Sequence, residues 1–134
     1  MATTVVPVTK ALYLCDDVVE DPSSRKVHLL GTFNALRPPA GATYPYRLGQ
    51  LCVFAQLAGG VGELPVRLEI VRARDDAVVY AAPERRLRFP SRLTMVSVCF
   101  RLRNRPFPEA GVYFVELYAR DAFLDDRALL LLVP

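Results

Sequence analysis

Apolar and polar residues alternate along most of this chain with a period of two, the period of a strand with one buried face. The clearest example is the segment 111–120. Its alternate positions carry Tyr113, Val115, Leu117 and Ala119 on one side and Phe114, Glu116, Tyr118 and Arg120 on the other. The aromatic and β-branched content of this segment also favours a strand over a helix.

The same pattern, punctuated by turn residues, predicts further strands. They are expected at 9–16, 26–33, 46–57, 63–73, 77–81, 93–103 and 128–133. The segment 83–90 is basic and irregular, and 123–126 forms a turn or a short strand. Gly59-Gly60-Val61-Gly62 joins 46–57 to 63–73 in what the pattern predicts to be a hairpin.

Short, regularly spaced strands without a helical pattern predict an all-β fold. We expect residues 1–134 to form a single-domain antiparallel β-sandwich of about 7–9 strands, immunoglobulin-like or C2-like. Gly111 precedes Tyr113 by two residues at the start of a late strand. This spacing is typical of the tyrosine corner of immunoglobulin-type sandwiches, in which the phenol bonds backbone across the preceding turn. The alternative is an ordinary core tyrosine with its hydroxyl at the rim.

Composition narrows the class of protein. Apolar residues make up 52% and charged residues 23% of the chain, which is typical of a folded domain. No apolar run approaches the roughly 20 residues of a membrane-spanning helix, and the first ten residues lack the pattern of a secretion signal. Cys15, Cys52 and Cys99 are odd in number and lie in apolar strands, which predicts free thiols in a reducing compartment, the cytoplasm.

The net charge of +3 is carried by 15 arginines and 2 lysines. Together with abundant Ala, Val, Leu and Pro, this imbalance is typical of GC-rich codon usage. A positive stripe would result if five arginines shared one sheet face: Arg85, Arg86, Arg88, Arg101 and Arg103. Because no aromatic residue is interleaved for base stacking, we expect a solvated face and consider nucleic acid an unlikely partner.

Three segments carry a resemblance to a known family. They are Cys15-Asp16-Asp17, the strand from Lys26 to Phe33 with its Gly31, and the run from Pro106 to Phe114. In these segments the chain resembles a family of small uncharacterised bacterial proteins, a domain of unknown function. The resemblance implies a β-sandwich and carries no activity, ligand or catalytic residue.

Catalytic signals are sparse. His28 is the only histidine, and imidazole is the usual general base near neutral pH. No nucleophile elbow accompanies it. An enzyme using Cys15 or His28 therefore ranks third, below the two binding functions described next. We expect no catalysis and no cofactor.

Acidic turns offer an alternative function. Loop carboxylates gathered at one end of a sandwich would suit Ca²⁺, which takes six to eight oxygen ligands. The candidates are Asp16, Asp17, Asp21, Asp75, Asp76, Asp125 and Asp126. The Asp-x-Asp spacing of calcium loops is absent, and Asp is common in turns because it bends and caps backbone. A loop-borne metal or small-ligand module therefore ranks second.

Two strands are apolar on both faces. In 46–57, Cys52 and Phe54 alternate with the core positions, and in 128–133, Leu130 and Leu132 do so. The second face must meet solvent, another chain, or a covering loop such as 38–44. We therefore expect a non-catalytic binding or scaffold module that self-associates or joins a protein complex, with Cys52, Phe54, Leu130 and Leu132 as interface candidates and edge pairing of the last strand as one route.

Overall fold

The computed structural model describes residues 3–134, and Met1 and Ala2 of the predicted domain lie outside it. Within these residues the chain forms ten strands and no helix, so no helix could cross a membrane. The strands are β1 (Val8–Glu20), β2 (Val27–Thr32), β3 (Ala35–Leu36), β4 (Tyr46–Ala58), β5 (Gly62–Arg72), β6 (Ala77–Ala81), β7 (Arg85–Phe89), β8 (Val96–Phe107), β9 (Gly111–Ala119) and β10 (Ala122–Leu131).

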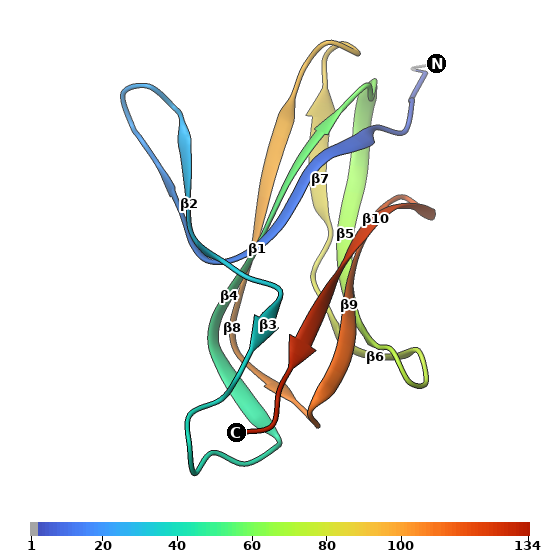
Figure 1. Cartoon of the computed structure of the whole chain (residues 1–134). Helices are drawn as coiled ribbons and strands as arrows, with labels where there is room; N and C mark the ends of the chain where they lie inside the picture. Colours follow the sequence, from blue (N-terminus) through green and yellow to red (C-terminus); the bar gives the residue numbers. More distant parts are fainter. Residues whose placement is uncertain (1–2) are drawn as a thin grey trace.

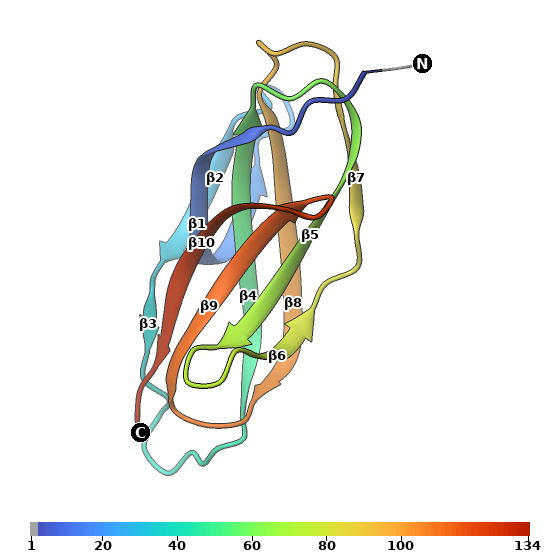
Figure 2. The same ribbon diagram turned by 90° about the vertical axis from the view of Figure 1, so that its right-hand side faces the viewer.

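The strands form two sheets packed face to face, which confirms the predicted β-sandwich (Figures 1 and 2). One sheet has the order β2-β1-β4-β8, and the other β3-β10-β9-β5-β6, with β7 also pairing β5. All pairs are antiparallel except the short β3–β10 pair. If β1, β4 and β8 are taken as strands A, B and E, and β5, β9 and β10 as C, F and G, the arrangement is that of an immunoglobulin-type sandwich.

The expected hairpin between 46–57 and 63–73 is wrong. β4 pairs with β1 and β8, whereas β5 belongs to the other sheet. The turn between them crosses from sheet to sheet, because Gly59 and Gly62 adopt positive φ angles of 79° and 89°. Other elements also differ from expectation: β1 continues to Glu20, 35–36 and 85–89 are strands, and 122–131 is one strand.

One hydrophobic core lies between the sheets. Alternate residues of β4, β5, β8 and β9 point inward, as the periodicity predicts. Fully buried members include Leu57, Leu68 and Leu117. The inner faces of the two sheets therefore account for the alternating apolar residues. The apolar residues on the outer faces need a separate explanation.

Tyr113 proves to be both a core residue and a tyrosine corner. Its side chain is fully buried and packs edge-on against Phe107, with ring centroids 5.2 Å apart. Its hydroxyl donates to the Glu109 carbonyl oxygen at 2.7 Å and accepts from the Glu109 amide at 3.3 Å. The residue therefore fastens the β8–β9 turn to the core.

Tyr113→Phe should destabilise the fold by about 1–3 kcal/mol, because the Glu109 carbonyl and amide would lose a buried partner. Urea unfolding followed by circular dichroism measures the change. Tyr118→Phe is the matched control, since it removes a half-buried hydroxyl that donates to Glu116 Oε1 at 3.0 Å, and it should cost under about 1 kcal/mol. Equal losses in the two variants would contradict the corner's role.

Candidate functional site

The two parts of strand β1 pair with different strands. Its first part, Val8 to Cys15, pairs with β4 in the sandwich, whereas its second part pairs with β2 in a hairpin that leaves the sheet. We call residues 16–32 the arm; in Figure 1 it is the blue hairpin that splays away from β4 and β8. Gly31 lies at the bend with a φ of 66°, and a Cβ there would collide with the carboxylate of Asp16. Glycine is therefore the least strained residue at this position.

The arm covers the second apolar face of β4. Its inward residues Val18 and Leu29 pack on Cys52 and Phe54, which are 0% and 5% exposed. The suggestion that loop 38–44 covers this face is therefore wrong. Burial within the chain also removes the reason for which Cys52 and Phe54 were candidates for an interface.

The C-terminal strand is not a free edge at Leu130 and Leu132. Both residues are half-buried, and their amides donate to the carbonyl oxygens of Asn34 (2.8 Å) and Leu36 (2.9 Å). β3 thus occupies the edge that was expected to pair with another chain. Edge pairing through these two residues is excluded while β3 is in place.

A charged clamp fixes the base of the arm. Arg101 of β8 contacts Asp17 at 2.5 Å and donates to the Val18 carbonyl oxygen at 2.6 Å. Gln50 of β4 donates to the Asp16 carbonyl oxygen at 3.0 Å. The hydrogen bond from Arg101 lowers the pKa of Asp17, so the carboxylate stays ionised and the clamp stays charged at neutral pH.

All three cysteines gather beneath this clamp. Cys15 and Cys52 are cross-strand partners, and Cys99 lies beside them on β8. Burial raises the pKa of Cys15 to about 11 and that of Cys99 to about 12, which keeps both thiols protonated and unreactive at neutral pH. His28 is exposed, and because it neighbours the inward-facing Leu29 it points away from the thiols. The structure does not bring His28 beside a thiol.

Between the arm and the sheet lies an open groove. The arm lies against the sheet at its base and diverges from it toward its tip (Figure 1). A hollow of about 540 Å³ lies between the two. Tyr13, Phe54, Gln56 and Ser97 form its floor, on three neighbouring strands. Arg25, Lys26 and Val27 form its roof. A hollow of about 220 Å³ shares Phe54 and Ser97 with it and leads to Arg101.

A second hollow, of about 310 Å³, lies at the opposite end beside Tyr113. Its charged groups satisfy one another: Glu109 contacts Arg72 at 3.0 Å and Arg74 at 2.7 Å, and Arg72 also contacts Asp75 at 2.8 Å. This network braces the tyrosine corner. We therefore assign it a structural role and take the groove beneath the arm as the candidate functional site.

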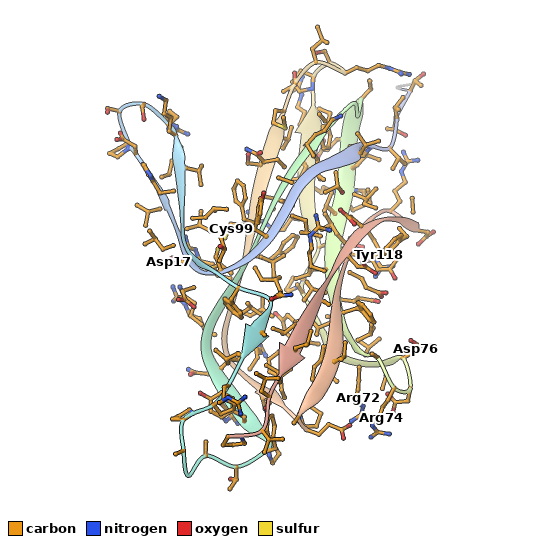
Figure 3. The ribbon with its side chains drawn as sticks, in the orientation of Figure 1. Asp17, Arg72, Arg74, Asp76, Cys99 and Tyr118 are labelled. Carbon is orange, nitrogen blue, oxygen red and sulfur yellow. The ribbon has the colours of Figure 1, made fainter. Side chains whose placement is uncertain are left out.

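The acidic candidates for a calcium site lie far apart. Asp16 and Asp17 are at the base of the arm and Asp21 is at its tip, where it accepts from the amides of Ser23 and Ser24. The others are Asp75 and Asp76 in the β5–β6 turn and Asp125 and Asp126 in β10. Figure 3 shows Asp17 and Asp76 on opposite sides of the molecule. Among residues 3–134 no three acidic, cysteine or histidine side chains are placed to hold a metal ion.

The five arginines of the possible positive stripe do not share one sheet face. Arg85, Arg86 and Arg88 lie on β7, whereas Arg101 and Arg103 lie on β8 of the other sheet. Arg85 instead spans the gap and donates to the Cys99 carbonyl oxygen at 3.2 Å, on the unpaired edge of β8. Arg86 approaches Glu63 at 4.0 Å. The condition for a positive stripe, five arginines on one sheet face, is therefore not met.

Sequence reasoning did not identify the groove residues Tyr13, Lys26, Gln56 and Ser97. Lys26 begins a segment that carries the family resemblance, but that resemblance assigns it no role, and the other three belong to no motif. The available signal was indirect, because the second apolar row of β4 required a cover that the sequence did not specify.

These features define a class of protein: an immunoglobulin-type β-sandwich with an arm inserted between its first two sandwich strands. The chain belongs to a family of unknown function (DUF6941), whose model matches residues 10–131. No curated protein matches the sequence significantly.

Among solved structures, a β-glucosidase from Listeria innocua in complex with isofagomine is similar, with a TM-score of 0.53 and 10% identity. The alignment covers 94% of this chain but only 16% of that chain. At this identity the likeness concerns the fold alone.

Arg101→Met should loosen the arm and expose the thiols beneath it. The variant loses an ion pair, whose two side chains are about 40% exposed, and a hydrogen bond to the Val18 carbonyl oxygen. The arm should then open more often, which should raise the rate of cysteine labelling roughly tenfold. Labelling with Ellman's reagent at neutral pH measures the rate. Arg103→Met, on the same strand and without an ion pair among the described residues, should leave the rate unchanged. Similar acceleration by both variants would rule out the clamp.

Proposed function

We propose that this chain is a non-catalytic binding module that joins a protein complex through the groove beneath the arm. The observation that carries this proposal is the groove itself, an open hollow of about 540 Å³ formed by an insertion into the sandwich. Ligand sites commonly measure about 300–1,000 Å³ and combine apolar walls with a few polar groups. The exposed side chains of Tyr13 and Val27 supply the apolar part, and Gln56 and Ser97 the polar part.

Two observations support binding without catalysis. The thiols of Cys15 and Cys99 have pKa values raised by burial, so neither is poised as a nucleophile. The single histidine lies on the far side of the arm from them. By contrast, Tyr13 is 50% exposed at the mouth of the groove, and a half-exposed aromatic side chain is a common anchor in protein interfaces.

We place this function in the bacterial cytoplasm. Three free cysteines, two of them buried, support a reducing compartment, because thiols this close together are prone to oxidation outside one. The resemblance in the Cys15 to Asp17 and Lys26 to Phe33 segments supports a bacterial origin.

Self-association is the second candidate function. Val19 and Leu30 of the arm are 44% and 49% exposed and offer an apolar contact to another copy. Sedimentation equilibrium separates the two candidates, since a mass above 15.0 kDa that falls on Val19→Ser would favour self-association.

The groove should bind peptides selected from a random dodecamer display library. Ser97→Trp fills the groove from its exposed floor and should weaken a selected peptide at least tenfold, as measured by fluorescence anisotropy. Val112→Trp, at a 40% exposed position on the other sheet, is the control and should bind normally. Failure to select any peptide, or equal binding by both variants, would count against the groove as the site.

A further inference from the structure

We infer that the outer face of the six-stranded sheet is a second docking surface, which binds an extended segment of a partner protein in which a lysine or arginine lies between two apolar residues. This inference goes beyond the groove, which lies on the other sheet. It follows from an uncovered apolar row on this face and from a row of carboxylates beside it.

The apolar row lies across four strands of the sheet. The arm covers the second apolar face of β4, whereas no other part of residues 3–134 lies over β5, β9 and β10, the face that Figure 2 turns toward the viewer. Directly opposed residues on neighbouring strands share a face. They extend the row from β10 to β6: Ala128 opposes Phe114, Phe114 opposes Val71, and Val71 opposes Val78. Val78 is 54% exposed, so this row is available to a partner.

A row of three carboxylates lies next to the apolar row. Glu116 of β9 is directly opposite Glu69 of β5 and Asp126 of β10. Like charges at such positions destabilise a sheet. Arg67 contacts Glu69 at 2.7 Å and the hydroxyl of Tyr118 donates to Glu116 at 3.0 Å, but within residues 3–134 no cation contacts the carboxylate of Glu116 or Asp126. A cation supplied by a partner would relieve this repulsion.

The charge of the face stays negative when its surroundings are counted. The three carboxylates lie beside one cation, Arg67, which leaves a charge of −2. The other charged residues of β5, β6, β7, β9, β10 and the turns β5–β6, β6–β7, β8–β9 and β9–β10 cancel. They are seven arginines (Arg72, Arg74, Arg85, Arg86, Arg88, Arg120 and Arg127) and seven carboxylates (Glu63, Asp75, Asp76, Glu84, Glu109, Asp121 and Asp125). The face therefore attracts a basic segment, although the whole chain carries +3.

The spacing of the rows fits an extended occupant. Phe114, Glu116 and Tyr118 are alternate residues of one strand, so their side chains are about 7 Å apart. An extended segment has the same spacing, and it would place an apolar residue on Phe114, a cation at Glu116 and a second apolar residue beside Tyr118 and Phe123. Phe123 is 53% exposed, and its ring packs edge-on against that of Tyr118 with centroids 5.7 Å apart. The expected sequence of the partner is apolar-x-basic-x-apolar.

Two other occupants fit less well. A second copy of this chain presents the same charge of −2 on this face, which opposes face-to-face packing. A divalent cation would suit carboxylates, but nowhere in residues 3–134 are three acidic, cysteine or histidine side chains placed to hold one metal ion.

The test uses the Ser97→Trp variant, whose groove is filled, as the target for the dodecamer display library. We expect the selected peptides to carry Lys or Arg between apolar residues, with an excess of Lys and Arg over Asp and Glu. Adding Glu116→Gln and Asp126→Asn together should weaken a selected peptide about tenfold in fluorescence anisotropy, and added salt should weaken it as well. Because the two changes remove repulsion between carboxylates, they should not lower the melting temperature.

Two further variants in the same background locate the site. Val112→Trp, two residues from Phe114 on the same face, should weaken the selected peptides although it spares peptides bound in the groove. Glu84→Gln removes an exposed carboxylate from the β6–β7 turn and should leave binding unchanged.

The other outcomes would overturn the inference. They are the selection of no peptide, peptides without a basic excess, and an equal loss in Glu84→Gln. A dimer that Val112→Trp dissociates would identify a second copy as the occupant, and heat of Ca²⁺ binding that the Gln and Asn changes abolish would identify a metal site. Because the groove is filled in every protein tested, these results do not depend on the proposed function of the groove.

Discussion

One strand with two apolar faces determines much of this structure. The inner face of β4 packs in the sandwich, and its outer face places Cys52 and Phe54 where a sheet normally meets water. Leaving that row exposed would cost stability and invite association. The chain meets the requirement from within, by folding the second half of β1 back over the sheet. The arm thus covers the outer apolar face of β4, and the groove is the space that the arm leaves open.

The base and the tip of the arm differ in how tightly they pack against the sheet. At its base, Val18 packs on the thiol cluster, and Arg101 fixes the backbone beside it. Toward the tip these contacts end, and the side chains of Lys26 and Val27 face an open hollow. Tight contacts at one end let the other end stand away from the sheet without unfolding. Such a division is common where a rigid scaffold carries a binding loop.

Sequence periodicity was sufficient for the fold class and for most strands, because a strand with one buried face reveals itself by alternation. The spacing before Tyr113 likewise indicated its corner. The sequence could not place β4 and β5 in different sheets, since the glycines that permit the crossing at Gly59 and Gly62 also suit a hairpin turn. Nor could it reveal the arm, because the pattern ended the first strand at residue 16 and gave no sign that β1 continues to Glu20 and pairs there with β2.

The outermost strand of the four-stranded sheet, β8, has a further consequence. A strand of 12 residues with an unpaired edge is a template on which another chain can assemble. Here Arg101, Arg103 and Arg105 project from it, and Arg85 occupies the carbonyl oxygen of Cys99. These cations make the edge a poor surface for intermolecular β-pairing. Three of the stripe candidates, Arg85, Arg101 and Arg103, thus lie at a strand whose free edge would otherwise be open to pairing with another chain.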